Sequence, residues 1–247
     1  MTGSPVHWVS AFIDAPPDRF DASAAFWATA TDSRAGRAVG DRDEFVPLEA
    51  PHGDPCLWLQ RTDDGPVGCH PDLYVKDVDA VAAKAVELGA TRLSVTDGLV
   101  VLTSPGLLPF CLVTHRGQSV RPEPVGPSGT RSVVDQICLD IPPDRFEGEC
   151  DFWSGLTGWP RWRESHDEFD RLARPPGIPY AFLLQRLDEE QPAVRAHLDL
   201  ACDDRDAVTA QHEAQGADVV RRTAGWTVMR DPAGMVYCAT TRAPGEV

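Results

Sequence analysis

The segment PPDRFDASAAFW at residues 16–27 returns as PPDRFEGECDFW at residues 142–153, 126 positions further along the chain. Other segments recur in the same order, with offsets that stay between 124 and 127: Asp43–Phe45 as Asp167–Phe169, Leu59–Arg61 as Leu184–Arg186, His70–Leu73 as His197–Leu200, Asp79–Val81 as Asp206–Val208, Gly89–Ala90 as Gly216–Ala217, and Phe110–Cys111 as Tyr237–Cys238. A repeat that keeps its order and spacing over a hundred residues indicates two copies of one structural unit in tandem.

A stretch rich in proline and glycine separates the two copies. It includes RPEPVGPSG at residues 121–129, a composition typical of an extended linker. We therefore expect one domain over residues 5–116, a linker over 117–130 and a second domain over 131–243.

Each copy divides again into a strand, a helix and three strands, twice over. Alternation over residues 9–13 predicts a strand, and the spacing of Phe20, Ala24 and Trp27 predicts one apolar face of a helix. Asp77 is a suitable N-cap and Gly89 a suitable C-cap for a second helix. The first copy is predicted to contain strands at 9–13, 45–48, 56–61, 70–75, 91–95, 99–103 and 110–114 and helices at 18–29 and 78–88. In the second copy, strands are predicted at 133–139 and 197–202 and helices at 144–156 and 204–215.

The bulk composition excludes several classes of partner. The net charge is −15 and the pI about 4.7, so nucleic acid and anionic membrane surfaces should be repelled. No apolar run is long enough to cross a bilayer, and the first residues lack the pattern of a signal peptide. The seven cysteines form no Cys-x-x-Cys pair, so we expect buried thiols in a reducing, cytoplasmic protein.

Motifs of several large enzyme classes are missing from the sequence. The chain has no Gly-rich phosphate loop, no Gly-x-Ser-x-Gly and no His-Glu-x-x-His. Hydrolase and nucleotide-dependent functions therefore have no support.

The recurring segments resemble one known superfamily. A helix ending in Phe-Trp, the run Leu-Gln-Arg, the motif His-x-Asp-Leu, a helix ending in Gly-Ala and the segment WTVMRDPAG at residues 226–234 are similar to the glyoxalase/bleomycin-resistance/extradiol-dioxygenase (vicinal oxygen chelate) superfamily, in its glyoxalase-like group. The resemblance implies an α+β fold in which tandem domains are built from paired βαβββ modules, whose curled mixed sheets form a cleft. It also implies that a small molecule binds in the cleft, often over a divalent metal.

The resemblance places metal ligands on the first and last strands of the modules. His7, His70 and Gln60 are the candidates in the first domain, whereas Val133 stands where His7 would recur and leaves only His197 and Gln185 in the second. The terminal position, where the superfamily carries Glu, is expected at Pro109 and Val236, which have no donor atom. We therefore expect no cofactor, or a single divalent metal in the first domain only, since such a site needs three or four ligands.

His70 and His197 each precede an Asp by two residues, so strand alternation places each His and Asp on one face. Two interpretations stay open: a pair that contacts a ligand, or a structural polar pair. We expect the pairs on the concave face away from the helices, because burial beneath a helix would cost hydrogen bonds to water. The predicted ligand-binding residues are Trp58, Gln60, His70, Asp72, Gln185, His197, Asp199 and Trp226; no catalytic residue is assigned.

These observations favour a metal-independent small-molecule-binding protein, such as one that sequesters a drug. The alternative is a divalent-metal-dependent lyase, isomerase or dioxygenase of the same superfamily, and a regulatory protein with vestigial clefts is a third hypothesis. The expected partner is a small molecule rather than nucleic acid or membrane, and the chain is expected to be a monomeric pseudo-dimer or a homodimer. Whether clefts form within each copy or between modules of different copies stays open.

Overall fold

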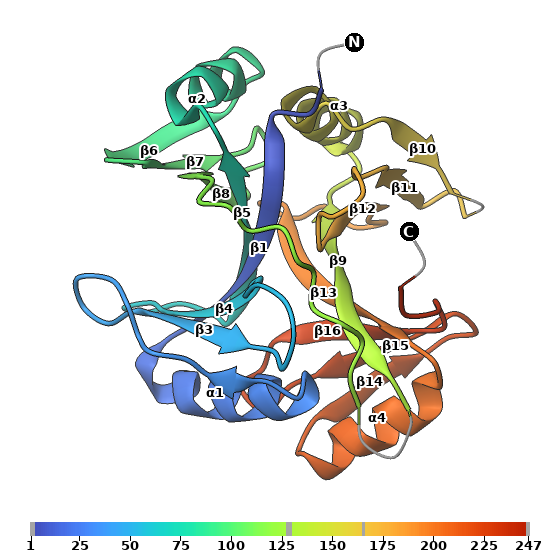
Figure 1. The fold of residues 1–247 in the computed structure, drawn as a ribbon. Coiled ribbons are helices and arrows are strands. Elements are labelled where there is room, and N and C mark those ends of the chain that lie inside the picture. Colours follow the sequence, from blue (N-terminus) through green and yellow to red (C-terminus); the bar gives the residue numbers. More distant parts are fainter. Residues whose placement is uncertain (1–2, 127–129, 165, 246–247) are drawn as a thin grey trace. The chain divides into compact units, whose positions relative to one another are not determined.

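The computed structural model describes residues 3–126, 130–164 and 166–245, so residues 127–129 of the predicted linker lie outside the described residues (Figure 1). The helices are α1 (Pro17–Ala30), α2 (Val78–Glu87), α3 (Phe146–Thr157) and α4 (Arg205–Ala214). The strands of the first copy are β1 (Val6–Ala15), β2 (Arg34–Ala35), β3 (Phe45–Glu49), β4 (Leu57–Arg61), β5 (Gly68–Val75), β6 (Thr91–Thr96), β7 (Leu99–Thr103) and β8 (Pro109–Thr114). Those of the second copy are β9 (Ser132–Ile141), β10 (Arg161–Arg163), β11 (Phe169–Leu172), β12 (Ala181–Arg186), β13 (Arg195–Cys202), β14 (Asp218–Arg222), β15 (Trp226–Arg230) and β16 (Val236–Thr240).

The strands form two eight-stranded mixed sheets with the same topology. Their orders are β2-β3-β4-β1-β5-β8-β7-β6 and β10-β11-β12-β9-β13-β16-β15-β14. The pairs β1·β4, β5·β8 and β13·β16 are parallel, while the outer pairs are antiparallel. Each module is therefore a strand, a helix and three strands, and the predicted α+β fold built from βαβββ modules is confirmed.

The helix signals in the sequence act as expected. The Asp77 carboxylate accepts a hydrogen bond from the backbone N–H of Ala80 at 2.9 Å, and Asp204 does the same for Ala207 at 3.0 Å. Such N-caps satisfy backbone donors that have no partner within the helix. Gly89 follows α2 with a φ of 104°, a left-handed conformation that favours glycine.

The chain divides into two compact units that do not coincide with the two sequence copies. Unit 1 comprises Met1–Ser10, His70–Ser119 and Ile137–Ala196, and unit 2 comprises Ala11–Cys69, Val120–Gln136 and His197–Val247. Unit 1 thus contains the second module of the first copy with the first module of the second copy. Unit 2 contains the other two modules, so modules from different copies share a compact core.

The core of each unit is built around the recurring Phe-Trp pair. In unit 2, the Trp27 and Tyr237 rings lie 5.1 Å apart, and Phe26 contacts Tyr237 at 5.7 Å (Figure 1, where α1 is blue and β16 red). In unit 1, Phe110 lies 5.1 Å from Trp153 and 5.8 Å from Phe152. Both pairs are buried, so they are core residues and do not form a surface on which a ligand could stack.

A buried histidine makes unit 2 sensitive to acid. The His212 ring contacts the Tyr237 hydroxyl at 2.9 Å, and burial lowers the pKa of His212 from 6.5 to about 4 because it disfavours the charged ring. The unfolded chain therefore binds a proton that the folded chain excludes, and stability falls as the pH drops from 7 to 4, by roughly 3 kcal/mol. Denaturant unfolding at both pH values should show that His212→Gln removes about this much of the loss. Equal losses in both proteins would contradict the assignment.

Candidate functional site

In unit 1, strand register places His70 and Asp72 on the face of the sheet away from the helices. Phe110 of β8 packs against α3, and Leu112, two residues further, lies beside the fully buried Leu73 of β5. Since side chains alternate along a strand, His70 and Asp72 face the other way. We call this helix-free face of each sheet the site face.

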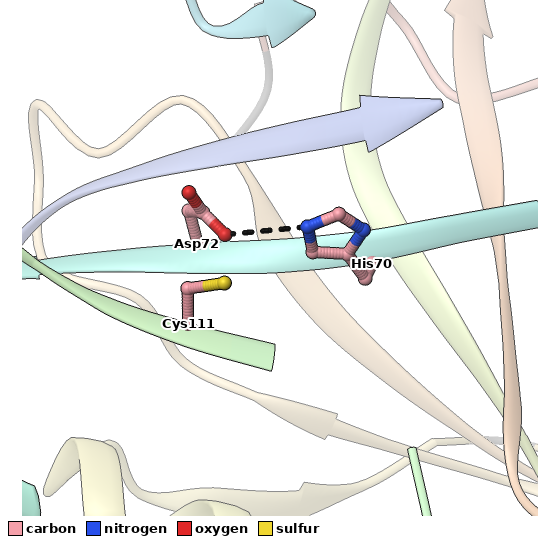
Figure 2. A group of neighbouring side chains, drawn as sticks. All are labelled: His70, Asp72 and Cys111. Carbon is pink, nitrogen blue, oxygen red and sulfur yellow. Dashed lines mark ion pairs between the residues drawn. The ribbon is translucent and has the colours of Figure 1, made fainter. Parts of the chain in front are cut away.

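A third side chain joins His70 and Asp72 there. Cys111 of β8 is the register partner of Asp72, so both side chains leave the sheet on the same face. The His70 Nε2 lies 3.5 Å from the Asp72 Oδ1, and the ligand atoms of His70, Asp72 and Cys111 all lie within 4.8 Å of one another (Figure 2). His70 and Asp72 are only 7% and 6% exposed, so the group is buried rather than open to an unobstructed cleft.

Unit 2 carries a corresponding His–Asp pair with a cysteine beside the histidine. His197 Nε2 lies 3.3 Å from Asp199 Oδ1 and 3.6 Å from Cys238 Sγ, and Cys238 is the register partner of Asp199. The three residues are 8%, 3% and 7% exposed. Tyr237, next to Cys238, packs against α1, so this group also lies on the site face. We call the two groups the His–Asp–Cys triads.

The electrostatics of the first triad argue against a nucleophilic cysteine. Burial, followed by the charge of Asp72, raises the pKa of Cys111 to about 12. A cysteine that acts as a nucleophile needs a lowered pKa, because the thiolate is the reactive form, whereas a bound cation deprotonates the thiol that coordinates it. What the triads offer instead is one nitrogen, one oxygen and one sulfur donor on adjacent parallel strands, a mixed set that suits a metal ion.

The other predicted ligand-binding residues also lie on the site face. On β4, Leu57 and Leu59 are buried toward α1, and Arg61 lies over the Phe20 ring of that helix at 3.6 Å. The intervening Trp58 and Gln60 therefore face the other side.

Trp226 and Gln185 follow the same alternation. Val228, two residues after Trp226, pairs with Cys238, so Trp226 shares the site face of unit 2. In unit 1, Phe182 packs against Trp153 of α3, while Gln185 accepts a weak hydrogen bond from the Cys138 thiol at 3.7 Å. Ligand binding by these residues stays a prediction.

The three metal ligands expected from the resemblance do not all belong to one compact unit. His7 and His70 belong to unit 1 and Gln60 to unit 2. The His7 and His115 rings lie in a tilted arrangement with centroids 5.3 Å apart, and burial, Lys76 and His115 together lower the pKa of His7. The potential metal ligands close to His70 are Asp72 and Cys111. A metal site formed by His7, Gln60 and His70 therefore stays a prediction, without support from the contacts of His70.

The expected terminal positions stay a prediction. Pro109 and Val236 begin their strands, and Val236 is 38% exposed. The residues that the last strands place beside the Asp side chains are Cys111 and Cys238, two positions further on. The sequence by itself predicts both cysteines only as buried thiols. Their recurrence at an offset of 127, the same as for His70 and His197, is the feature that pointed to a shared site.

The fold is similar to that of solved glyoxalases and ring-cleaving dioxygenases. A Mn(II)-bound glyoxalase from Novosphingobium aromaticivorans is 20% identical with a TM-score of 0.68, over 96% of this chain and 82% of that one. A catechol 2,3-dioxygenase is 16% identical with a TM-score of 0.61, over 99% and 91%. The 2,3-dioxygenase LapB from Pseudomonas sp. KL28 is 12% identical with a TM-score of 0.62, over 97% and 93%. At these identities the likeness establishes the fold alone.

Comparison with curated proteins finds no match to this sequence. Within the described ranges, no helix combines the length and the apolarity needed to cross a membrane. A profile of the glyoxalase-like domain matches residues 10–113 and again residues 136–240. The chain therefore belongs to the glyoxalase-like domain family and carries two tandem copies of the domain.

Proposed function

We propose that the chain binds a small organic molecule at the site faces, and that a divalent metal ion held by each His–Asp–Cys triad anchors it. The metal would supply Lewis-acid polarisation of a ligand oxygen. The observation that carries the proposal is the spacing of donor atoms in the triads.

That spacing matches the edges of a zinc coordination tetrahedron. With Zn–N and Zn–O of about 2.0–2.1 Å and Zn–S of about 2.3 Å, tetrahedral ligands lie about 3.3 Å apart for N and O and about 3.5 Å apart for N and S. The His–Asp separations are 3.5 Å and 3.3 Å, and the His197–Cys238 separation is 3.6 Å. Three protein ligands with a fourth position for another group is the pattern of catalytic zinc sites.

The proposal departs from the expectation of a metal-free second domain. That expectation counted His197 and Gln185 only, and left Asp199 and Cys238 out of the ligand set. The fold relatives include a Mn(II)-bound glyoxalase, and a thiolate in the ligand set favours a softer ion such as zinc.

A metal-free binding protein is the second candidate. The same His–Asp distances also suit a buried polar pair that satisfies itself without an ion. With a net charge of −15, such a protein would favour cationic ligands.

Cobalt(II) titration of the full chain separates the two candidates. Cobalt occupies zinc sites, and ligation by a thiolate gives a charge-transfer absorption in the near ultraviolet that nitrogen and oxygen ligands do not give. We expect this band in the unmodified chain and its loss in Cys111→Ala/Cys238→Ala.

The matched control is Cys69→Ala/Cys202→Ala. These cysteines lie on the same two strands, β5 and β13, but alternation turns them to the opposite face. The control should keep the band. If the unmodified chain shows no band, or the triad variant keeps it, the metal proposal fails and the metal-free candidate stands.

A further inference from the structure

The contact between helix and sheet in unit 2 depends on one buried carboxylate. The Trp27 indole N–H of α1 donates to the Asp231 Oδ2 at 2.9 Å. Asp231 lies in the β15–β16 loop, and its Oδ1 accepts from the backbone N–H groups of Ala233 at 2.9 Å and Met235 at 2.8 Å. Ser23, one helical turn before Trp27, is fully buried, and its hydroxyl has no hydrogen-bond partner among the described residues. We call this contact seam 2.

We call the equivalent contact in unit 1 seam 1. Its buried carboxylate belongs to the helix, whereas that of seam 2 belongs to the loop. Glu149 of α3 occupies the position of Ser23, at an offset of 126, and accepts from the Trp153 indole N–H at 2.9 Å. Its other oxygen accepts from the backbone N–H of Gly106 in the β7–β8 loop. Ser104 occupies the position of Asp231, at an offset of 127, and accepts from the Leu108 N–H at 3.1 Å. Each seam therefore contains one carboxylate, from the helix in seam 1 and from the loop in seam 2.

A third position, in the loop, also differs between the two seams in a way that matches the location of the carboxylate. A Cβ built at Gly106 would overlap Val194 Cγ2 and would lie 2.8 Å from Glu149 Oε1, so the loop of seam 1 needs glycine where it meets Val194 and the helix carboxylate. The corresponding residue in seam 2 is Ala233, which is fully buried beside a helix that carries only Ser23 at this position.

If the two modules of one copy paired with each other, one seam would contain no carboxylate and the other would contain two. Helix α1 against the loop of its own copy would combine Ser23 with Ser104, which leaves the Trp27 N–H without a carboxylate. Helix α3 against its own loop would combine Glu149 with Asp231 and would press the Ala233 methyl against Glu149. An unsatisfied buried donor and two facing buried carboxylates are both destabilising.

We infer that these three positions form a pairing code, so that each helix face accepts only the loop of the other copy's second module. The Phe-Trp pairs cannot supply this selectivity, because they are the same in both helices. The carboxylates, which are the groups with the highest cost when misplaced, carry it instead. The inference does not depend on what the triads bind.

Substitutions in seam 2 of the full chain reproduce each mismatch without changing the topology. Ser23→Glu places two carboxylates in the seam, as in the mismatch of the second copy. Asp231→Ser/Ala233→Gly removes the carboxylate, as in the mismatch of the first copy. The triple variant Ser23→Glu/Asp231→Ser/Ala233→Gly converts seam 2 to the chemistry of seam 1. Ser23→Ala is the control, because it alters the same position without adding charge.

We expect each mismatch to lower the melting temperature by about 5 °C or more, on the scale of one unsatisfied buried polar group in a chain of this size. The triple variant should recover most of that loss, and Ser23→Ala should remain within about 2 °C of the unmodified chain. If a mismatched variant does not fold, cooperative unfolding of the triple variant alone supports the inference. A triple variant that is no more stable than its component variants would overturn it.

Discussion

Alanine at both His70 and His197 is expected to lower the affinity of the chain for zinc by at least about 100-fold, since loss of a supporting residue alone typically costs 10- to 100-fold. Each substitution removes one of the three donors in a triad, and the remaining Asp and Cys cannot complete the site. Competition of zinc with a chromophoric chelator measures the affinity directly.

The control for this prediction is His52→Ala, which removes an exposed imidazole outside the triads. Its zinc affinity should equal that of the unmodified chain. Far-ultraviolet circular dichroism should show that the double variant keeps its secondary structure, because both histidines lie outside the helix-packed core. Unchanged zinc affinity in a folded double variant would exclude these histidines as ligands.

Asp135→Ala is expected to destabilise the fold by about 2–4 kcal/mol. The Arg242 guanidinium donates to both Asp135 oxygens, at 2.9 Å and 2.7 Å, and the Asp135 side chain is 2% exposed. Loss of one partner leaves the other charge poorly solvated, which costs about 3–5 kcal/mol for a fully buried pair. The expected value is lower because the Arg242 side chain remains 34% exposed.

The Arg131–Asp203 pair provides the comparison for Asp135. Its N–O distance is 2.8 Å, but both residues are considerably exposed, so Asp203→Ala should change stability by about 1 kcal/mol or less. Denaturant unfolding of both variants gives the two free energies. Equal effects would show that burial does not set the strength of the Asp135 contact.

The module order and the helices could be predicted from the sequence because both depend on local chemistry. The caps Asp77 and Asp204 and the apolar spacing around Trp27 and Trp153 are readable within a few residues. Strands β2 and β10 could not be anticipated. They are two and three residues long, largely exposed, and show no alternation of apolar and polar side chains.

The pairing of modules across the copies could not be deduced from the repeat. Both copies present the same Phe-Trp face, so apolar patterning alone allows either pairing. The difference lies at Ser23 and Glu149 on the helices and at Ser104 and Asp231 on the loops. These residues carry information about pairing only once each helix is known to lie against a particular loop.

The His and Asp positions of the site were predictable, whereas its cysteines were not. His70 and Asp72 share one strand, so their common face follows from alternation. Cys111 is 39 residues away from Asp72 and meets it only through the register of β5 and β8. Register between distant strands is a tertiary property, and an error of one residue would turn Cys111 to the other face.

Zinc stoichiometry of the full-length chain tests the central claim most directly. The protein would be purified without chelator, saturated with zinc, desalted and measured by elemental analysis against its own absorbance, with Cys111→Ala/Cys238→Ala treated in parallel. We predict about two zinc ions per chain for the unmodified protein, one for each triad, and almost none for the variant. A value near zero for the unmodified chain, or the same value for both proteins, would contradict the assignment of the triads as metal sites.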